Sequence, residues 1–190
     1  MDTKTLKQFA YIGAFLPEGE KERAKDRVRS ITSTFENEYL HHLTLLFKPK
    51  ADLEAVEKLL PWIGKEIQIK VTDLAQCVQP GHQVQAFLCE LPSGLYCANK
   101  YPHITVSSGT KEDGKPVPPA TSNALFESSP DPDPDLQWFG GSGSVQSNRR
   151  LAAFSGFAGF QRQPLILKAR VGMFSHKKEV GIVYDLEEIQ

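Results

Sequence analysis

Seven short runs rich in apolar and β-favouring residues are typical of β-strands, and helical patterns separate the first of them. Between Glu18 and Phe35, apolar residues return every three or four positions, which predicts an amphipathic helix over 18–35. The spacing over 53–60 predicts a second, shorter helix that ends near Pro61. The predicted strands cover residues 9–16, 39–47, 67–71, 83–91, 101–107, 165–174 and 180–186.

These elements fall into two successive groups, and each group includes one strand that carries a histidine. Such a pattern argues for an α+β protein of two similar lobes. A length of 190 residues suits a single compact domain over 1–190. Residues 108–147 are rich in Pro, Gly, Ser and Asp, and they predict a flexible insertion with one short ordered piece around 123–126. The last two strands are expected to form a hairpin through residues 175–178.

Two triplets of the form His-x-Thr occupy two of the predicted strands, as His42-Leu43-Thr44 and His103-Ile104-Thr105. Residues i and i+2 of a strand project from the same face, so each histidine stands beside its own threonine while the central residue points into the core. Two imidazoles and two hydroxyls suit a phosphodiester substrate. One histidine can activate water, the other can protonate the departing ribose oxygen, and the hydroxyls can bond the non-bridging oxygens.

The neighbouring His41 projects from the other face of its strand and lacks a threonine two positions on, so we expect it to be structural. A zinc site made of His41, His42 and His103 would require adjacent strand residues to converge on one ion. No carboxylate or cysteine falls at ligand spacing nearby. We therefore predict a site without a metal and without another cofactor.

With these two motifs, the chain resembles the 2H phosphoesterase superfamily, whose hallmark is two His-x-Thr/Ser motifs on two pseudo-symmetric lobes around a central cleft. The resemblance covers roughly residues 9–107 in the order of elements. The stretch from His103 through Asn123-Ala124-Leu125 is similar to the cyclic phosphodiesterase domain of tRNA ligases and related RNA-end enzymes. The specific part of the resemblance consists of His42, Thr44, His103 and Thr105, with Phe47 after the first motif and Pro102 before the second.

This resemblance implies an α+β fold in which two pseudo-symmetric lobes of antiparallel sheet with flanking helices surround a central cleft, as a single bilobal 2H phosphoesterase-like domain. It also implies metal-independent hydrolysis of a 2',3'-cyclic phosphate, at RNA ends or on cyclic nucleotides, to a 2'-phosphate. By analogy, His42 gives a proton to the leaving group and His103 takes one from water. The sequence leaves open whether these two roles are exchanged.

The chain departs from the family pattern between its two motifs, which begin 61 residues apart at positions 42 and 103. Only residues 92–100 separate the preceding strand from the second histidine strand, where many relatives have a helix. We expect a trimmed second lobe, or a helix displaced into 108–147. Two other functions stay open: a 2',5'-phosphodiesterase on 2'-5' oligonucleotides, and a non-catalytic RNA-end binding module whose Pro-rich segment serves as a partner ligand.

Further side chains are candidates for substrate contact. Ser107 shares a strand face with His103 and Thr105, so we add it to the predicted phosphate ligands, Thr44 and Thr105. Aromatic faces stack on nucleobases, and the candidates for that role are Tyr11, Tyr101 and Trp138. For Tyr11, packing in the core is the alternative role.

Composition limits the partners. A formal charge of -1 gives no general attraction to nucleic acid or to an anionic membrane, so an RNA substrate would be held by a few nucleotides only. No stretch approaches the roughly 18 consecutive apolar residues of a membrane span. Three cysteines without close pairing suit reduced thiols. We expect a monomer in the cytoplasm, or alternatively in the nucleus, that acts on RNA ends or small cyclic nucleotides.

Overall fold

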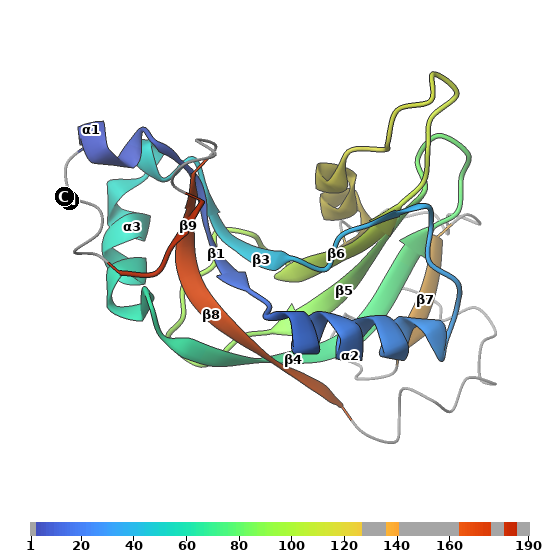
Figure 1. Cartoon of the computed structure of the whole chain (residues 1–190), viewed down its shortest axis with the longest axis horizontal. Helices are drawn as coiled ribbons and strands as arrows, with labels where there is room; N and C mark the ends of the chain where they lie inside the picture. Colours follow the sequence, from blue (N-terminus) through green and yellow to red (C-terminus); the bar gives the residue numbers. More distant parts are fainter. Residues whose placement is uncertain (1–2, 127–135, 141–163, 176–180, 186–190) are drawn as a thin grey trace.

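The structure is a computed structural model that describes residues 3–126, 136–140, 164–175 and 181–185. Strands dominate it (Figure 1). The helices are α1 (Thr3–Leu6), α2 (Glu18–Arg29) and α3 (Leu53–Leu59), with 3-10 turns η1 (Pro49–Ala51), η2 (Leu60–Trp62) and η3 (Pro119–Phe126). The strands are β1 (Phe9–Phe15), β2 (Asn37–Glu38), β3 (His42–Phe47), β4 (Glu66–Cys77), β5 (Val84–Glu90), β6 (His103–Ser108), β7 (Leu136–Gly140), β8 (Leu165–Ser175) and β9 (Ile182–Val183).

All the strands join one antiparallel sheet in the order β7-β4-β5-β6-β3-β1-β8-β9, and β2 pairs with β6. Because β4 pairs with β8 as well as with β5, the strands β4, β5, β6, β3, β1 and β8 close into a six-stranded barrel. The predicted α+β class with antiparallel strands is therefore confirmed. The finer prediction of two lobes around a central cleft stays a prediction.

The main core lies on one face of the sheet, where the alternating apolar residues of the strands meet α2 and α3. Leu43 of β3 and Ile104 of β6 are both fully buried there, together with Val28 of α2 and Leu59 of α3. The opposite face carries a smaller apolar cluster in which β5 packs against η3. Its members are Ala75, Val84, Ala86, Leu88, Leu125 and Phe126.

Helix α2 is shorter than the predicted helix over 18–35, because it ends at Arg29. The hydroxyl of Ser30 donates a hydrogen bond to the Arg27 carbonyl at 2.7 Å, and poor helix formers follow in residues 32–34. Further on, the backbone N–H of Phe35 donates to the Ser107 hydroxyl of β6 at 3.0 Å. A tertiary hydrogen bond thus replaces the one that a longer helix would have made.

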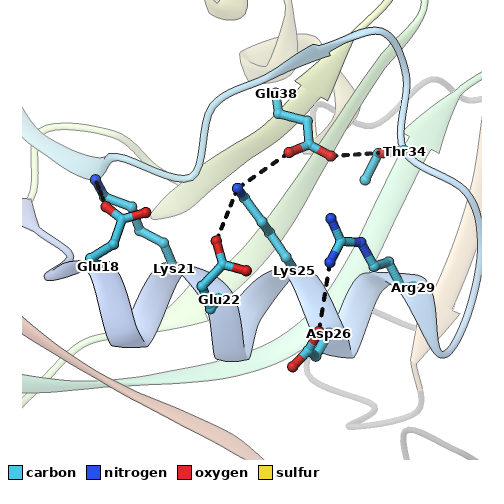
Figure 2. A network of polar contacts seen from close by, with 8 residues as sticks. All are labelled: Glu18, Lys21, Glu22, Lys25, Asp26, Arg29, Thr34 and Glu38. Carbon is cyan, nitrogen blue, oxygen red and sulfur yellow. Dashed lines mark hydrogen bonds and ion pairs between the residues drawn. The ribbon is translucent and has the colours of Figure 1, made fainter.

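Charged side chains link α2 to the segment that precedes β3 (Figure 2). Lys25 pairs with Glu22 on its own helix at 3.2 Å and with Glu38 of β2 at 3.4 Å, and the Thr34 hydroxyl donates to Glu38 at 3.1 Å. Exposed ion pairs of this kind contribute little individually. Their effect here is to join α2 to β2, four residues before His42.

A bulge precedes β3, which starts at His42 rather than at the predicted residue 39. On either side of this bulge, Glu38 lies opposite Ser107 and Leu43 lies opposite Ile104. The four residues 39–42 therefore lie opposite the two residues 105–106. Within the bulge, Leu40 has a φ of 58° in the left-handed region. Because of the bulge, the regular strand begins at His42 and not at its neighbour His41.

Most of the other predicted elements are confirmed. Strands β1, β5, β6 and β8 lie within a residue or two of their predicted ranges, α3 matches the shorter predicted helix, and β4 is longer than predicted. The predicted terminal hairpin is confirmed by the pairing of β8 with β9, although its loop lies outside the described residues. The ordered piece predicted around 123–126 is part of η3. Within the described residues, no helix is long and apolar enough to span a membrane.

Candidate active site

The two His-x-Thr triplets lie side by side on adjacent strands, β3 and β6. Leu43 and Ile104 are directly opposite each other in this antiparallel pair. His42 and Thr44 flank Leu43, and His103 and Thr105 flank Ile104, so a regular antiparallel register from this pair would set each histidine across from the threonine of the other triplet. We call these four half-buried side chains the array: His42, Thr44, His103 and Thr105.

Local sequence explains why these four side chains share a face. In each triplet the central residue and the residue after the threonine are apolar and buried, as Leu43 and Leu45 on β3 and Ile104 and Val106 on β6. Burial of this apolar set on the helix-packed face turns the intervening residues to the opposite face. The strand alternation predicted from the sequence is confirmed at both triplets.

His103 is held at both ring nitrogens. Its Nδ1 lies 2.8 Å from the carbonyl oxygen of Tyr101, and since a carbonyl only accepts, Nδ1 carries the hydrogen. Its Nε2 lies 3.1 Å from the hydroxyl of Ser122. Burial lowers the pKa of His103 below its ordinary value, and the hydrogen bond to Tyr101 opposes that shift. His103 is therefore neutral near pH 7, with the lone pair on Nε2.

His42 lies in an aromatic environment instead. Its ring stacks on Tyr11 with a centroid distance of 4.5 Å, and the ring of Phe15 lies 5.6 Å away. Burial lowers the pKa of His42 to about 4, and the charges of His41 and His103 act in the same direction. Without an anion nearby, His42 is uncharged at neutral pH.

The phenol of Tyr11 lies 3.4 Å from Nδ1 of His42, a long hydrogen bond. Burial raises the pKa of Tyr11 to about 12, so this phenol keeps its proton and can either donate to Nδ1 or accept from Nδ1–H, according to the tautomer of His42. The ring of Tyr11 also stacks on Phe174 at 4.9 Å. Tyr11 thus packs in an aromatic cluster and at the same time lines the array, so both of its predicted roles are compatible with its position.

Ser122 was not predicted from the sequence, yet it contacts two members of the array. Its hydroxyl oxygen lies 2.9 Å from that of Thr105, 3.1 Å from Nε2 of His103 and 2.7 Å from the Pro119 carbonyl oxygen. It belongs to η3, in the Pro-rich stretch after the second motif. No local pattern could have revealed this contact, because it depends on how η3 folds back over β6.

The structure does not bring every predicted residue to the array. Ser107 is fully buried, donates to Gln85 at 2.6 Å and accepts from Phe35, so its hydroxyl bonds to β5 and to the segment before β2 rather than to the array. The half-buried Tyr101 stands at the edge of the array, where its ring lies 6.4 Å from Phe126. The backbone of Trp138 is in β7, separated from β6 by β4 and β5, and its side chain lies outside what the structure describes.

His41 lies outside the array, in the bulge before β3. Its ring is 6.4 Å from that of Tyr39, and the charge of Lys21 on α2 is among the causes that lower its pKa, after burial. Across the described part of the chain, no group of three or more His, Cys, Asp or Glu side chains is arranged to hold a metal ion. The side chains that meet in the array are two imidazoles and two hydroxyls.

A scan against models of known protein families finds no match for this chain, and neither does a search of curated proteins. The geometry of the array is therefore the basis on which a function can be assigned.

Proposed function

We propose that this chain hydrolyses a 2',3'-cyclic phosphate, at RNA ends or on small cyclic nucleotides, and leaves a 2'-phosphate. The observation that carries the proposal is the register of Leu43 against Ile104, which puts two histidines on one diagonal of the array and two threonines on the other. A phosphate above the centre of the array would reach both hydroxyls through its non-bridging oxygens. It would also have one imidazole on each side.

That diagonal suits an in-line displacement at phosphorus, in which the entering oxygen approaches from the side opposite to the leaving oxygen. One imidazole can serve the attacking water while the other serves the ribose oxygen that leaves. A positioned acid or base typically contributes about 10²–10⁴-fold to the rate. We propose that both histidines contribute in this way, without a metal ion.

His103 suits the role of base. The Tyr101 carbonyl holds the hydrogen on Nδ1, so that Nε2 presents its lone pair, and the same carbonyl stabilises the imidazolium once it forms. In the proposed step, water gives a proton to Nε2 of His103 as its oxygen forms a bond to phosphorus. The bond from phosphorus to the ribose 3' oxygen breaks, and that oxygen takes a proton from His42.

His42 suits the role of acid only when substrate is present, because burial keeps its free pKa near about 4. A bound phosphate brings a negative charge next to the ring, and an opposite charge within a few ångströms favours the protonated form. The phenol of Tyr11 near Nδ1 leaves Nε2 of His42 to carry the transferable proton. Substrate binding and activation of the acid are thus coupled.

The proposal includes membership of the 2H phosphoesterase superfamily, with the two motif strands assigned to two lobes of one bilobal domain and the array in the cleft between them. Its support is the adjacency of β3 and β6 and the placement of each motif on the face away from the main core. Tyr11 and Tyr101 are proposed to contact the nucleoside. The implied protein is a monomer of the cytoplasm or the nucleus.

The test is hydrolysis of 2',3'-cyclic AMP and of a short RNA ending in a 2',3'-cyclic phosphate, with products identified by phosphorus NMR. We expect wild-type activity in EDTA and a loss of at least about a hundredfold in His42→Ala and in His103→Ala. His41→Ala is the matched control, since it removes the neighbouring imidazole outside the array, and it should retain activity.

Other outcomes would contradict the proposal. Activity that disappears with EDTA would exclude the metal-free mechanism, and full activity in His42→Ala would exclude the assigned acid. Cleavage of 2'-5' oligonucleotides with no action on cyclic phosphates would favour the alternative phosphodiesterase. Nucleotide binding without turnover, unchanged in both histidine variants, would favour an RNA-end binding module.

A further inference from the structure

The hydroxyl of Ser122 lies among three polar atoms and has only one hydrogen to give. The Pro119 carbonyl oxygen is 2.7 Å away, Nε2 of His103 is 3.1 Å away and the Thr105 hydroxyl is 2.9 Å away. Two of these three are acceptors when His103 is neutral, and the Thr105 hydroxyl can either donate or accept. Ser122 therefore cannot donate to the Pro119 carbonyl and to neutral Nε2 at once.

Protonation of His103 removes this competition. A neutral His103 with its hydrogen on Nδ1 needs a donor at Nε2, and Ser122 is the donor within reach. A charged His103 carries hydrogens on both nitrogens and needs an acceptor at Nε2. Rotation of the Ser122 hydroxyl satisfies both states, because its hydrogen turns to the Pro119 carbonyl when its oxygen accepts from Nε2.

Packing of η3 holds Ser122 at this place. Ser122 is only 1% exposed, so water does not replace it freely. Leu125 and Phe126 of the same turn are buried against β5, and the Phe126 ring lies 5.4 Å from that of His103. The hydroxyl is thus fixed in distance while its hydrogen remains free to reorient.

We propose that Ser122 is a positioning residue for His103, which donates to Nε2 of the neutral imidazole and accepts from Nε2–H of the imidazolium. The proposal extends the proposed hydrolysis and depends on it for its kinetic consequence alone. In the catalytic step, the Ser122 hydroxyl turns its hydrogen to the Pro119 carbonyl, which frees the Nε2 lone pair for the proton from water, and its oxygen is then the acceptor for the new Nε2–H. The imidazolium hydrogen bond is charge-assisted and is the stronger of the two, so Ser122 favours the protonated form.

Few other groups in the described residues are close enough to His103 to change its pKa. The titratable side chains around His103 are His42 on β3 and the phenol of Tyr101, which packs on the same Phe126 ring. The ammonium nitrogen of Lys100 lies over the Tyr101 ring, 5.1 Å from the ring centroid. Residues 119–126 of η3 include no charged residue, and β5 presents Leu88 opposite His103. Ser122 is therefore the polar contact of Nε2 that the described residues provide.

The first test is NMR of the imidazoles and needs no activity. Long-range proton–nitrogen correlation of the wild-type protein should show neutral His103 with its hydrogen on Nδ1. Titration of Ser122→Ala should show a pKa of His103 lower by about one unit, a tenfold loss of proton affinity, because the imidazolium loses its acceptor. Ser122→Cys keeps a side chain of similar size with a weak hydrogen-bonding group, and it should shift in the same direction.

Ser108→Ala is the matched control. Ser108 is also a fully buried serine whose hydroxyl donates to a backbone carbonyl, that of Val117 at 2.7 Å, and it has no contact with either array histidine. This variant should leave the pKa of His103 unchanged. A neutral His103 with its hydrogen on Nε2 would overturn the proposal. So would a pKa of His103 that is the same in Ser122→Ala, Ser122→Cys and wild type.

The second test is the pH dependence of hydrolysis. If His103 is the base, the acid limb of the kcat profile, which reports groups of the enzyme–substrate complex, should move to lower pH in Ser122→Ala, with a maximum rate about tenfold lower because a weaker base remains. A uniform fall of rate with an unmoved limb would contradict the positioning role. A wild-type protein without any hydrolysis would exclude the proposed function, while the NMR result would still decide the role of Ser122.

Discussion

Leu43 of β3 lies directly opposite Ile104 of β6, and both side chains are fully buried. This one pairing sets the geometry of the array. A regular antiparallel register from this pair would set His42 across from Thr105 and Thr44 across from His103. A slip of one residue would turn one motif to the core face of the sheet, so the burial of Leu43 and Ile104 protects the register.

The threonines of the array should determine phosphate affinity. Thr44→Val and Thr105→Val keep the shape of the side chain and remove one hydroxyl, and a hydrogen bond to a charged group contributes roughly 1.5–3 kcal/mol. We expect each variant to raise KM for 2',3'-cyclic AMP by about 10-fold or more. Steady-state kinetics measures this. Thr72→Val, which removes a buried threonine hydroxyl outside the array, should leave KM unchanged; equal effects at all three positions would contradict the assignment.

His42 should make the fold sensitive to acid. Its pKa is about 4 in the folded protein and about 6.5 when unfolded, so between these values the unfolded chain binds more protons. The contribution of His42 to the free energy of unfolding is complete above about pH 6.5. It is lost as the pH falls towards 4, and the loss is at most about 3 kcal/mol. Urea unfolding across this range should show a shallower pH dependence in His42→Gln than in wild type. Parallel curves for the two proteins would show that His42 is not the group responsible.

Phosphate should raise the pKa of His42. Inorganic phosphate is an anion without a nucleoside, and its charge above the array would favour imidazolium at both array histidines. In NMR titrations with phosphate, the resonances of His42 and His103 should titrate at higher pH than in chloride of equal ionic strength. His41, outside the array, should respond far less. A shift confined to His41 would place the anion elsewhere.

The aromatic ring of Tyr11 should contribute more to kcat/KM than its hydroxyl does. The stacking distance to His42 is 4.5 Å, whereas the hydroxyl contact to Nδ1 is long at 3.4 Å. Tyr11→Phe keeps the ring and should leave kcat/KM within about threefold of wild type, because long hydrogen bonds are weak. Tyr11→Leu removes the stacking partner and should lower kcat/KM by about tenfold or more, since aromatic pairs contribute roughly 0.5–1.5 kcal/mol beyond burial and also orient the ring. A larger loss in Tyr11→Phe than in Tyr11→Leu would contradict this ranking.

Local patterns in the sequence determined the strands and the face that each motif occupies. Apolar residues such as Leu45 and Val106 alternate with the array residues, and burial of one set exposes the other. The same reasoning separated His42 from His41. These features are predictable because the alternation of strand side chains depends on neighbours in the chain alone.

Contacts between distant segments decided the rest. The closure of β4 on β8, the bulge at Leu40 and the end of α2 at Arg29 all depend on hydrogen bonds to partners far along the chain. Ser122 reaches His103 only because η3 packs on β5 through Leu125 and Phe126. The sequence by itself determined which side chains share a strand face, whereas the tertiary structure decided which strands are neighbours, since strand pairing is set by the burial of the whole apolar set.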